Sequence, residues 1–233
     1  LRQKAHDLYN PEQHTNLAYQ FDADVEAAGL AHESWAAWIQ GCPDRARQLG
    51  DAAVSWAAAL EHPFSQAFTL SFAAQTYAWC GDTRKTSEYA NRGIALSEKH
   101  KMFVWMNSCG FLKIWAAMQE TRSTAELSLL ESNLAVTTMV GLELGRIFDS
   151  AAVAEQYGLA GRGTEGLALA QESLDQIERS GFKMLESHLY CVKGALLLRS
   201  DHDETAAESC YRKAIDSARA IQAKSWELRA ALR

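Results

Sequence analysis

The sequence predicts an all-α fold, a right-handed α-solenoid of about five antiparallel helix pairs. Helix breakers are scarce, since the 233 residues include only 3 prolines and 14 glycines, which favours long helices over many short strands. The chain also shows an internal period of about 40 residues. Small residues recur where the two helices of a pair would meet. Pairs that repeat in this way shield their apolar faces by stacking on neighbouring pairs.

Turn residues share one column when the chain is written in blocks of about 40 from Asp22. The column holds Gly41, Gly81, Thr121, Gly161 and Asp201. Glycine reaches the left-handed conformation that ends a helix at little cost. Each position in this column is therefore expected to separate the two helices of one pair. A second reversal, between pairs, is expected near His62-Pro63, Gly141 and Gly181.

Small residues flank each turn on both sides. Seven positions before the turn stand Ser34, Ala74, Ile114, Ala154 and Gly194, and five positions after it stand Ala46, Thr86, Glu126, Gly166 and Ala206. Most of these side chains are small, so the paired helices can approach closely there.

The blocks also give the expected domain organisation. Residues 1–21 end a preceding helical unit, with a turn at Asn10-Pro11, and residues 22–233 form the repeat domain. Its units are 22–61, 62–101, 102–141, 142–181, 182–221 and a partial unit 222–233.

The two helices of a unit differ in pattern. Pro63–Cys80 is apolar on nearly every side, as expected of a helix that is covered on two faces. The segment after Glu204 has an apolar stripe and a charged face, which predicts an amphipathic outer helix. Ser123 with Glu126 has the spacing of a capping box at a helix start. Asp201 with Glu204 repeats that spacing.

The turn glycine, the small residue five positions later and a tyrosine four positions earlier, as at Tyr77 and Tyr157, resemble the tetratricopeptide repeat. The period here is longer than the usual length of about 34 residues. Further segments are similar to the C-terminal helical-repeat region of bacterial multidomain signalling proteins. These segments are Glu61-His-Pro-Phe-Ser-Gln-Ala-Phe, Gly141-Leu-Glu-Leu-Gly-Arg, Ala207-Glu-Ser-Cys-Tyr-Arg-Lys-Ala-Ile and Ala223-Lys-Ser-Trp-Glu-Leu-Arg-Ala-Ala.

Members of that bacterial family carry an adenylyl/guanylyl cyclase domain or a DNA-binding transcriptional domain, then an AAA-like regulatory ATPase, then the helical repeats. The resemblance implies a cytoplasmic sensor or docking arm that holds no catalytic residues itself. A start at Leu1 without methionine, and an end inside a helical pattern, also lead us to expect a fragment of a longer protein.

Composition excludes several classes of function. The net charge is −6 and no Lys/Arg run is present, so the basic face that nucleic acid requires is missing. No apolar run reaches the ~18 residues of a membrane span, so neither nucleic acid nor membrane is an expected partner. The five cysteines are widely spaced without a C-x-x-C motif, which indicates reduced thiols in the cytoplasm.

Motifs that carry chemistry are missing as well. Neither a P-loop nor an H-E-x-x-H motif occurs. His202-Asp203-Glu204 is interpreted as a solvated helix start, because acids are stabilised near the positive end of a helix. We therefore expect no enzymatic activity, no cofactor and no metal in this segment.

The first helix of each pair lines the concave side of such a solenoid, and the tetratricopeptide alignment gives the side chains that face the groove. These candidate binding residues are Trp35, Trp38, Phe68, Ser71, Gln75, Ser108, Phe111, Trp115, Phe148, Glu155 and His188. Aromatic anchors with a few amides and hydroxyls suit a helix or an extended peptide. Alternatively, the same aromatic residues fill the space between helix pairs.

The predicted function is therefore a binding module for a peptide, a neighbouring protein domain or a small effector. The alternative is a structural module that self-associates, as a homodimer through its terminal helices, and spaces catalytic domains. An all-α enzyme is the third hypothesis, and Glu155 and Asp149 are the acids that would have to converge in a pocket.

Overall fold

The computed structural model describes residues 8, 10, 18, 22–200 and 202–233. Over these residues the protein is all-helical, with eleven α-helices from α3 to α13 and no strand. The predicted all-α class is thus confirmed. Apart from residues 8, 10 and 18, the segment 1–21 that was expected to end a preceding unit lies outside the described residues. The chain divides into two compact units, residues 1–38 with 42–120 (unit 1) and residues 39–41 with 121–233 (unit 2).

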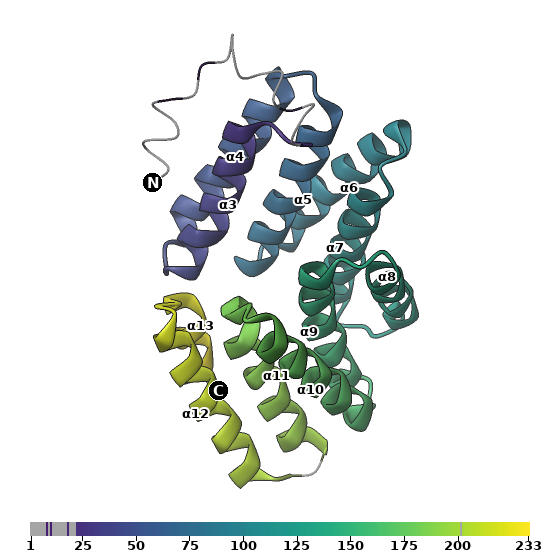
Figure 1. The fold of residues 1–233 in the computed structure, drawn as a ribbon. Helices are drawn as coiled ribbons and strands as arrows, with labels where there is room; N and C mark the ends of the chain where they lie inside the picture. Colours follow the sequence, from purple (N-terminus) through teal and green to yellow (C-terminus); the bar gives the residue numbers. More distant parts are fainter. Residues whose placement is uncertain (1–7, 9, 11–17, 19–21, 201) are drawn as a thin grey trace. The chain divides into compact units, whose positions relative to one another are not determined.

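Consecutive helices within each unit run in opposite directions and are joined by short turns (Figure 1). The helices of unit 1 are α3 (Val25–Ile39), α4 (Pro43–Ala59), α5 (Pro63–Trp79), α6 (Thr83–His100) and α7 (Phe103–Thr121). Those of unit 2 are α8 (Leu127–Met139), α9 (Glu143–Leu159), α10 (Gly163–Ser180), a 3-10 turn (Lys183–Leu185), α11 (Glu186–Ser200), α12 (Glu204–Ala220) and α13 (Lys224–Ala231).

The helix bounds recur along the sequence. Helix α9 begins at residue 143 and ends at residue 159. Both bounds lie eighty positions after those of α5, which begins at 63 and ends at 79. The same offset relates α10, at 163 and 180, to α6, at 83 and 100. Helices of equal length therefore stand at equal spacing in the two units.

Every connection between consecutive described α-helices contains a residue with positive φ. These residues are Gly41, Glu61, Gly81, Lys101, Arg122, Gly141, Gly161, Gly181, His202 and Gln222. Glycine was predicted at five of these positions because it adopts this conformation without steric cost. The turn predicted at Thr121 was wrong by one position. Thr121 is the last residue of α7, and Arg122 has a φ of 51°. Where no glycine stands at the expected turn position, the helix therefore includes that position and ends one residue later.

The predicted capping boxes were misplaced. Ser123 Oγ accepts from the amide of Ala125 at 3.1 Å, and Glu126 is the residue that precedes α8 without a side-chain cap. At α12 the cap is Asp203, whose Oδ1 accepts from the amide of Ala206 at 2.9 Å. Asp201 lies outside the described residues. The spacing of residues along the sequence did not distinguish Asp201 from Asp203, two positions later, as the residue that caps α12.

Small residues do bring paired helices together, as predicted. A Cβ on Gly166 of α10 would lie 2.9 Å from the backbone oxygen of Ala154 on α9. A Cβ on Gly194 of α11 would lie 2.9 Å from the ring of Tyr211 on α12. Both contacts are closer than real Cβ atoms tolerate, so the spacing of these helices depends on glycine.

The prediction that α5 is covered on two sides is confirmed. This helix contributes buried residues to two core clusters of unit 1. One cluster joins Leu70 and Ala74 to Tyr89 of α6 and Leu112 of α7. The other joins Phe68 to Leu30 of α3 and to α4. A helix packed on both faces needs apolar residues nearly all round.

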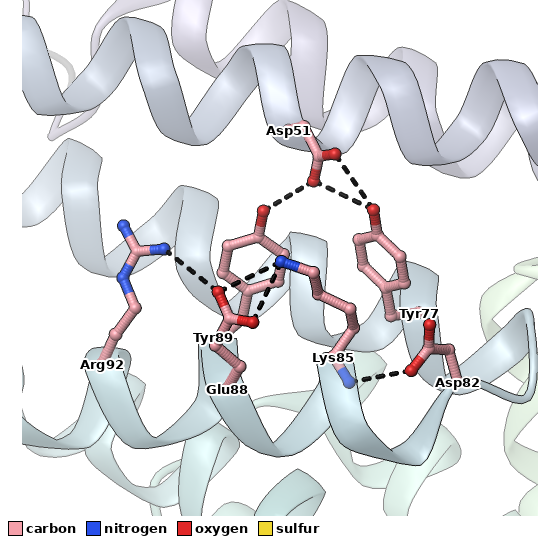
Figure 2. A network of polar contacts seen from close by, with 7 residues as sticks. All are labelled: Asp51, Tyr77, Asp82, Lys85, Glu88, Tyr89 and Arg92. Atoms are coloured by element: carbon pink, nitrogen blue, oxygen red, sulfur yellow. Dashed lines mark hydrogen bonds and ion pairs between the residues drawn. The ribbon is translucent and has the colours of Figure 1, made fainter.

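A carboxylate shared by two tyrosines ties α4, α5 and α6 together (Figure 2). The hydroxyl of Tyr89 donates to Asp51 Oδ1 at 2.6 Å, and that of Tyr77 lies 3.0 Å from Oδ2. Burial raises the pKa of both phenols, and the Asp51 carboxylate raises it further. Unit 2 has a related contact, in which Tyr157 donates to Glu131 at 2.9 Å and Arg162 donates to the same carboxylate.

We predict that Tyr77→Phe and Tyr89→Phe each lower the free energy of unfolding by about 1.5–3 kcal/mol, the value of a hydrogen bond to a charged group. Tyr157→Phe should cost less, because Tyr157 is only partly buried and Glu131 keeps a cationic partner, Arg162. Urea unfolding followed by circular dichroism tests this order. Equal losses for the three variants would contradict it.

Candidate functional site

Eight aromatic rings form a continuous row across the first helices of unit 1, here called the aromatic row. Its members are His32, Trp35 and Trp38 of α3, Phe64, Phe68, Phe72 and Trp79 of α5, and Trp105 of α7. Each ring touches at least one other ring of the row. The row therefore connects three helices that are separated in sequence by the outer helices α4 and α6.

Close stacking holds the centre of the row. The Trp35 and Phe72 rings lie 4.0 Å apart at 14°, and Phe72 and Phe68 lie 4.3 Å apart at 27°. Trp105 meets Phe68 edge to face at 5.3 Å. At the other end Trp38 stacks on Trp79 at 5.0 Å. The Phe68–Trp105 and Trp38–Trp79 distances fall in the usual range of aromatic pairs, about 4.5–7 Å, and the two central stacks are closer still.

Part of the row is accessible. Trp38, Phe68 and Trp79 are buried, whereas Trp35, Phe64, Phe72 and Trp105 are partly exposed. His32 is exposed at the edge of the row. The row thus combines buried rings with rings that keep part of their surface accessible.

Hydrogen bonds orient two members of the row. His32 Nδ1 donates to the backbone oxygen of Ala28 at 2.7 Å. Because a carbonyl can only accept, the neutral imidazole carries its proton on Nδ1 and keeps Nε2 as an acceptor. Trp35 Nε1 donates to the backbone oxygen of Phe72 at 3.2 Å, which fixes the indole against α5.

The structure gathers some of the predicted binding residues and separates others. Trp35, Trp38 and Phe68 belong to the aromatic row. The other members of the row were not among the predicted site residues. The i, i+4, i+8 spacing of Phe64, Phe68 and Phe72 is the sequence signal that could have found two of them.

Three other predicted residues of unit 1, Ser71, Phe111 and Trp115, pack in or against its core. Ser71 is buried and hydrogen-bonds the buried Cys109 thiol. Phe111 is 4% exposed. Trp115 is partly buried against the cluster that contains Cys109. Gln75 and Ser108 are partly exposed on α5 and α7.

Three predicted residues lie in unit 2, where they do not form an aromatic row. His188 of α11 stacks on Trp226 of α13 at 4.8 Å and 20°. Burial lowers the pKa of His188 to about 3, and Arg229 and Arg233 contribute in the same direction, so the imidazole is neutral at physiological pH. Glu155 of α9 lies 3.8 Å from Arg233. Phe148 of α9 is partly buried.

Among the five cysteines, the buried Cys109 and Cys191 lack the features of activated nucleophiles. All five are free thiols. Burial raises the pKa of Cys109 to about 12 and that of Cys191 to about 11, whereas catalytic cysteines have lowered values.

One serine–histidine pair has the distance of a catalytic pair. Ser65 Oγ lies 2.8 Å from His62 Nδ1, and it also accepts from the Asp24 amide. Ser65 is completely buried, and His62 accepts from the Ser65 amide as the cap of α5. This arrangement joins two helix starts and gives a substrate no access to the serine.

Among the residues that the structure covers, no group of three or more His, Cys, Asp or Glu side chains is placed to bind a metal ion. In the same part of the chain no helix combines the length and the apolar character needed to cross a bilayer. The sequence matches no protein-family model and shows no significant similarity to a curated protein.

Proposed function

We propose that this chain is a non-catalytic, tetratricopeptide-like binding module that holds an apolar peptide segment of a partner, or of a neighbouring domain, on the aromatic row. The observation that carries the proposal is the continuity of the row across α3, α5 and α7. A surface of linked, partly exposed aromatic rings supplies large contact area with little loss of side-chain entropy.

The proposed architecture is a right-handed α-solenoid with a unit of about 40 residues. The bounds of α9 and α10 follow those of α5 and α6 at a constant offset of eighty positions, which is two such units and supports this period. The left-handed residue in every connection supports it too. In this proposal the module belongs to a larger cytoplasmic signalling protein of bacteria, as the sequence resemblance implies.

Two features of the row select an extended or helical peptide with apolar side chains. The partly exposed rings of Trp35 and Phe72 would contact aliphatic or aromatic side chains of the peptide and bury them. His32 Nε2 would accept a hydrogen bond from a peptide N–H group. The uncharged lining gives no reason to expect an anionic or cationic ligand at this surface.

Panning a random peptide-display library against the full chain tests the proposal. We expect enriched peptides to be rich in apolar residues, and the double variant His32→Ala/Trp35→Ala to bind them at least about tenfold more weakly. Tyr190→Ala is the matched control, because Tyr190 is a partly buried ring of unit 2. Equal binding by the row variant and the wild type would contradict the proposal.

Self-association is the second candidate, and the last helix favours it. Leu228 and Leu232 on and after α13 are 61% and 77% exposed, and the depression between α12 and α13, of about 380 Å³, is lined by Tyr211, Ile215 and Ala230. Sedimentation velocity separates the candidates. A dimer that dissociates on Leu228→Glu/Leu232→Glu substitution would favour the structural module, and a monomer would favour the peptide-binding module.

A further inference from the structure

Helix α13 keeps an exposed apolar face. Leu228 on the helix and Leu232 directly after it are four positions apart and are 61% and 77% exposed. Trp226 and Ala230 lie on the opposite side of the helix and are buried. Leu228 and Leu232, together with the exposed Ala231, are here called the α13 face. Large apolar side chains gathered on one exposed face mark a site of interaction.

The corresponding positions of the earlier first helices are covered. Leu228 and Leu232 stand six and ten positions after Gln222, the left-handed residue that precedes α13. The same count in α5, α7, α9 and α11 gives residues that are at most 6% exposed, apart from the partly buried Asn107. A first helix of this fold therefore has other helices packed on this face. The residues at these positions are Ala67 and Ser71, Asn107 and Phe111, Ile147 and Ala151, and Ser187 and Cys191.

Small residues of the following helices provide this cover. In α11, Cys191 belongs to one core cluster with Ala214 of α12 and Ala230 of α13. A stripe of small side chains lets a second helix approach a first helix closely, which large side chains would prevent. The buried stripe of α12 follows the spacing of one helix face and consists of Ala207, Cys210, Ala214 and Ala218.

The depression between α12 and α13 borders the α13 face. Its apolar lining includes Tyr211 and Ile215 of α12 and Ala230 and Ala231 of α13. A helix with an apolar stripe can enter such a depression, and charged residues on its flanks can pair with charges of either sign beside it. The charged residues that also line the depression are Glu204, Glu208, Arg212 and Arg233.

We propose that the α13 face binds an amphipathic helix of a partner protein, whose apolar stripe consists of small residues as the stripe of α12 does. The partner helix lies against α13 as α12 lies against α11, and it buries Leu228 and Leu232. In a second copy of the chain the small residues of α4, α6, α10 and α12 are already buried within their own units, so these helices are not available for the contact. This surface is separate from the aromatic row and gives the proposed binding module a second partner.

Panning a display library of helical peptides against the full chain tests the proposal. The peptides have the 17 residues of α12, with the four stripe positions varied between small and large apolar residues. We expect the enriched peptides to carry Ala, Gly or Ser at the stripe, and Leu228→Glu/Leu232→Glu to bind them at least about tenfold more weakly. Enrichment of large residues at the stripe, or of no peptide that depends on Leu228 and Leu232, would overturn the proposal.

Leu159→Glu is the matched control. Leu159 of α9 is another exposed leucine of unit 2, at 51%, and its substitution should leave this binding unchanged. The row variant His32→Ala/Trp35→Ala should also leave it unchanged. Failure of the α13 proposal and failure of the proposal for the aromatic row can therefore be told apart.

Ala231→Arg decides the question if the double glutamate variant does not fold. Ala231 is exposed and lines the depression, so a long cationic side chain there blocks the partner helix without entering the core. We expect this variant to bind the enriched peptides about tenfold more weakly, and full binding would overturn the proposal. Sedimentation velocity should show a monomer. A dimer that Leu228→Glu/Leu232→Glu dissociates would also overturn the proposal, because a second copy would then cover α13.

Discussion

Gly166→Leu is expected to destabilise unit 2 by about 3 kcal/mol or more, through overpacking that the helices cannot relieve. A Cβ at Gly166 would lie 2.9 Å from the backbone oxygen of Ala154 and 3.0 Å from the Leu196 side chain. Leu196 could change its rotamer, but the backbone of α9 would have to move away from α10. Thermal unfolding and hydrogen exchange of α9 and α10 measure the loss.

Gly29→Leu provides the same chemical change without the clash. A Cβ at Gly29 of α3 meets nothing within 4 Å, and replacing an interior helical glycine stabilises a helix by roughly 0.5–1 kcal/mol. The two substitutions should thus have opposite signs. A Gly166→Leu protein as stable as the wild type would show that α9 and α10 do not depend on this close approach.

Asp24→Ala is expected to lower the stability of unit 1 by about 2–4 kcal/mol. Asp24 is completely buried, and its Oδ1 accepts from the Ala27 amide at 2.9 Å and from Trp56 Nε1 at 3.0 Å. Loss of a helix cap costs about 1 kcal/mol. Removing an acceptor from a partly buried indole N–H adds about 1–3 kcal/mol. Urea unfolding of the full chain gives the difference.

Asp82→Ala separates the two contributions. Asp82 also caps a helix, since its Oδ1 accepts from the Lys85 amide at 2.9 Å, and its loss should cost about 1 kcal/mol. A double-mutant cycle of Asp24→Ala with Trp56→Phe then isolates the contact between α3 and α4. A coupling energy of zero would show that the indole does not depend on Asp24.

Local sequence signals were sufficient for the helices and for most of their ends. Pro63 and Gly81 act through their own backbone preferences, because proline suits a first helical turn and glycine tolerates positive φ. Where the local signal was weak, as at Thr121 and Ser123, the predicted boundary was displaced. The sequence also anticipated which helices would be covered on two faces, since apolar residues all round α5 leave no solvent face.

The aromatic row depended on information that no single helix contains. Trp35 was predicted to face a groove, but its stacking partner Phe72 lies 37 positions away. Ser71 was expected in the same groove and instead contacts Cys109. A rotation of one helix by a fraction of a turn exchanges such neighbours, and that rotation is set by the packing of adjacent helices.

By itself, the sequence determined the all-α class, the positions of the turn glycines and the close approach of paired helices, because each follows from backbone preference or side-chain size at one position. Only the tertiary structure decided which aromatic rings meet on α3, α5 and α7, and that Asp149 is buried with Thr137 as its partner. These features arise between helices, where burial removes water from a side chain and the neighbouring element supplies the contact in its place.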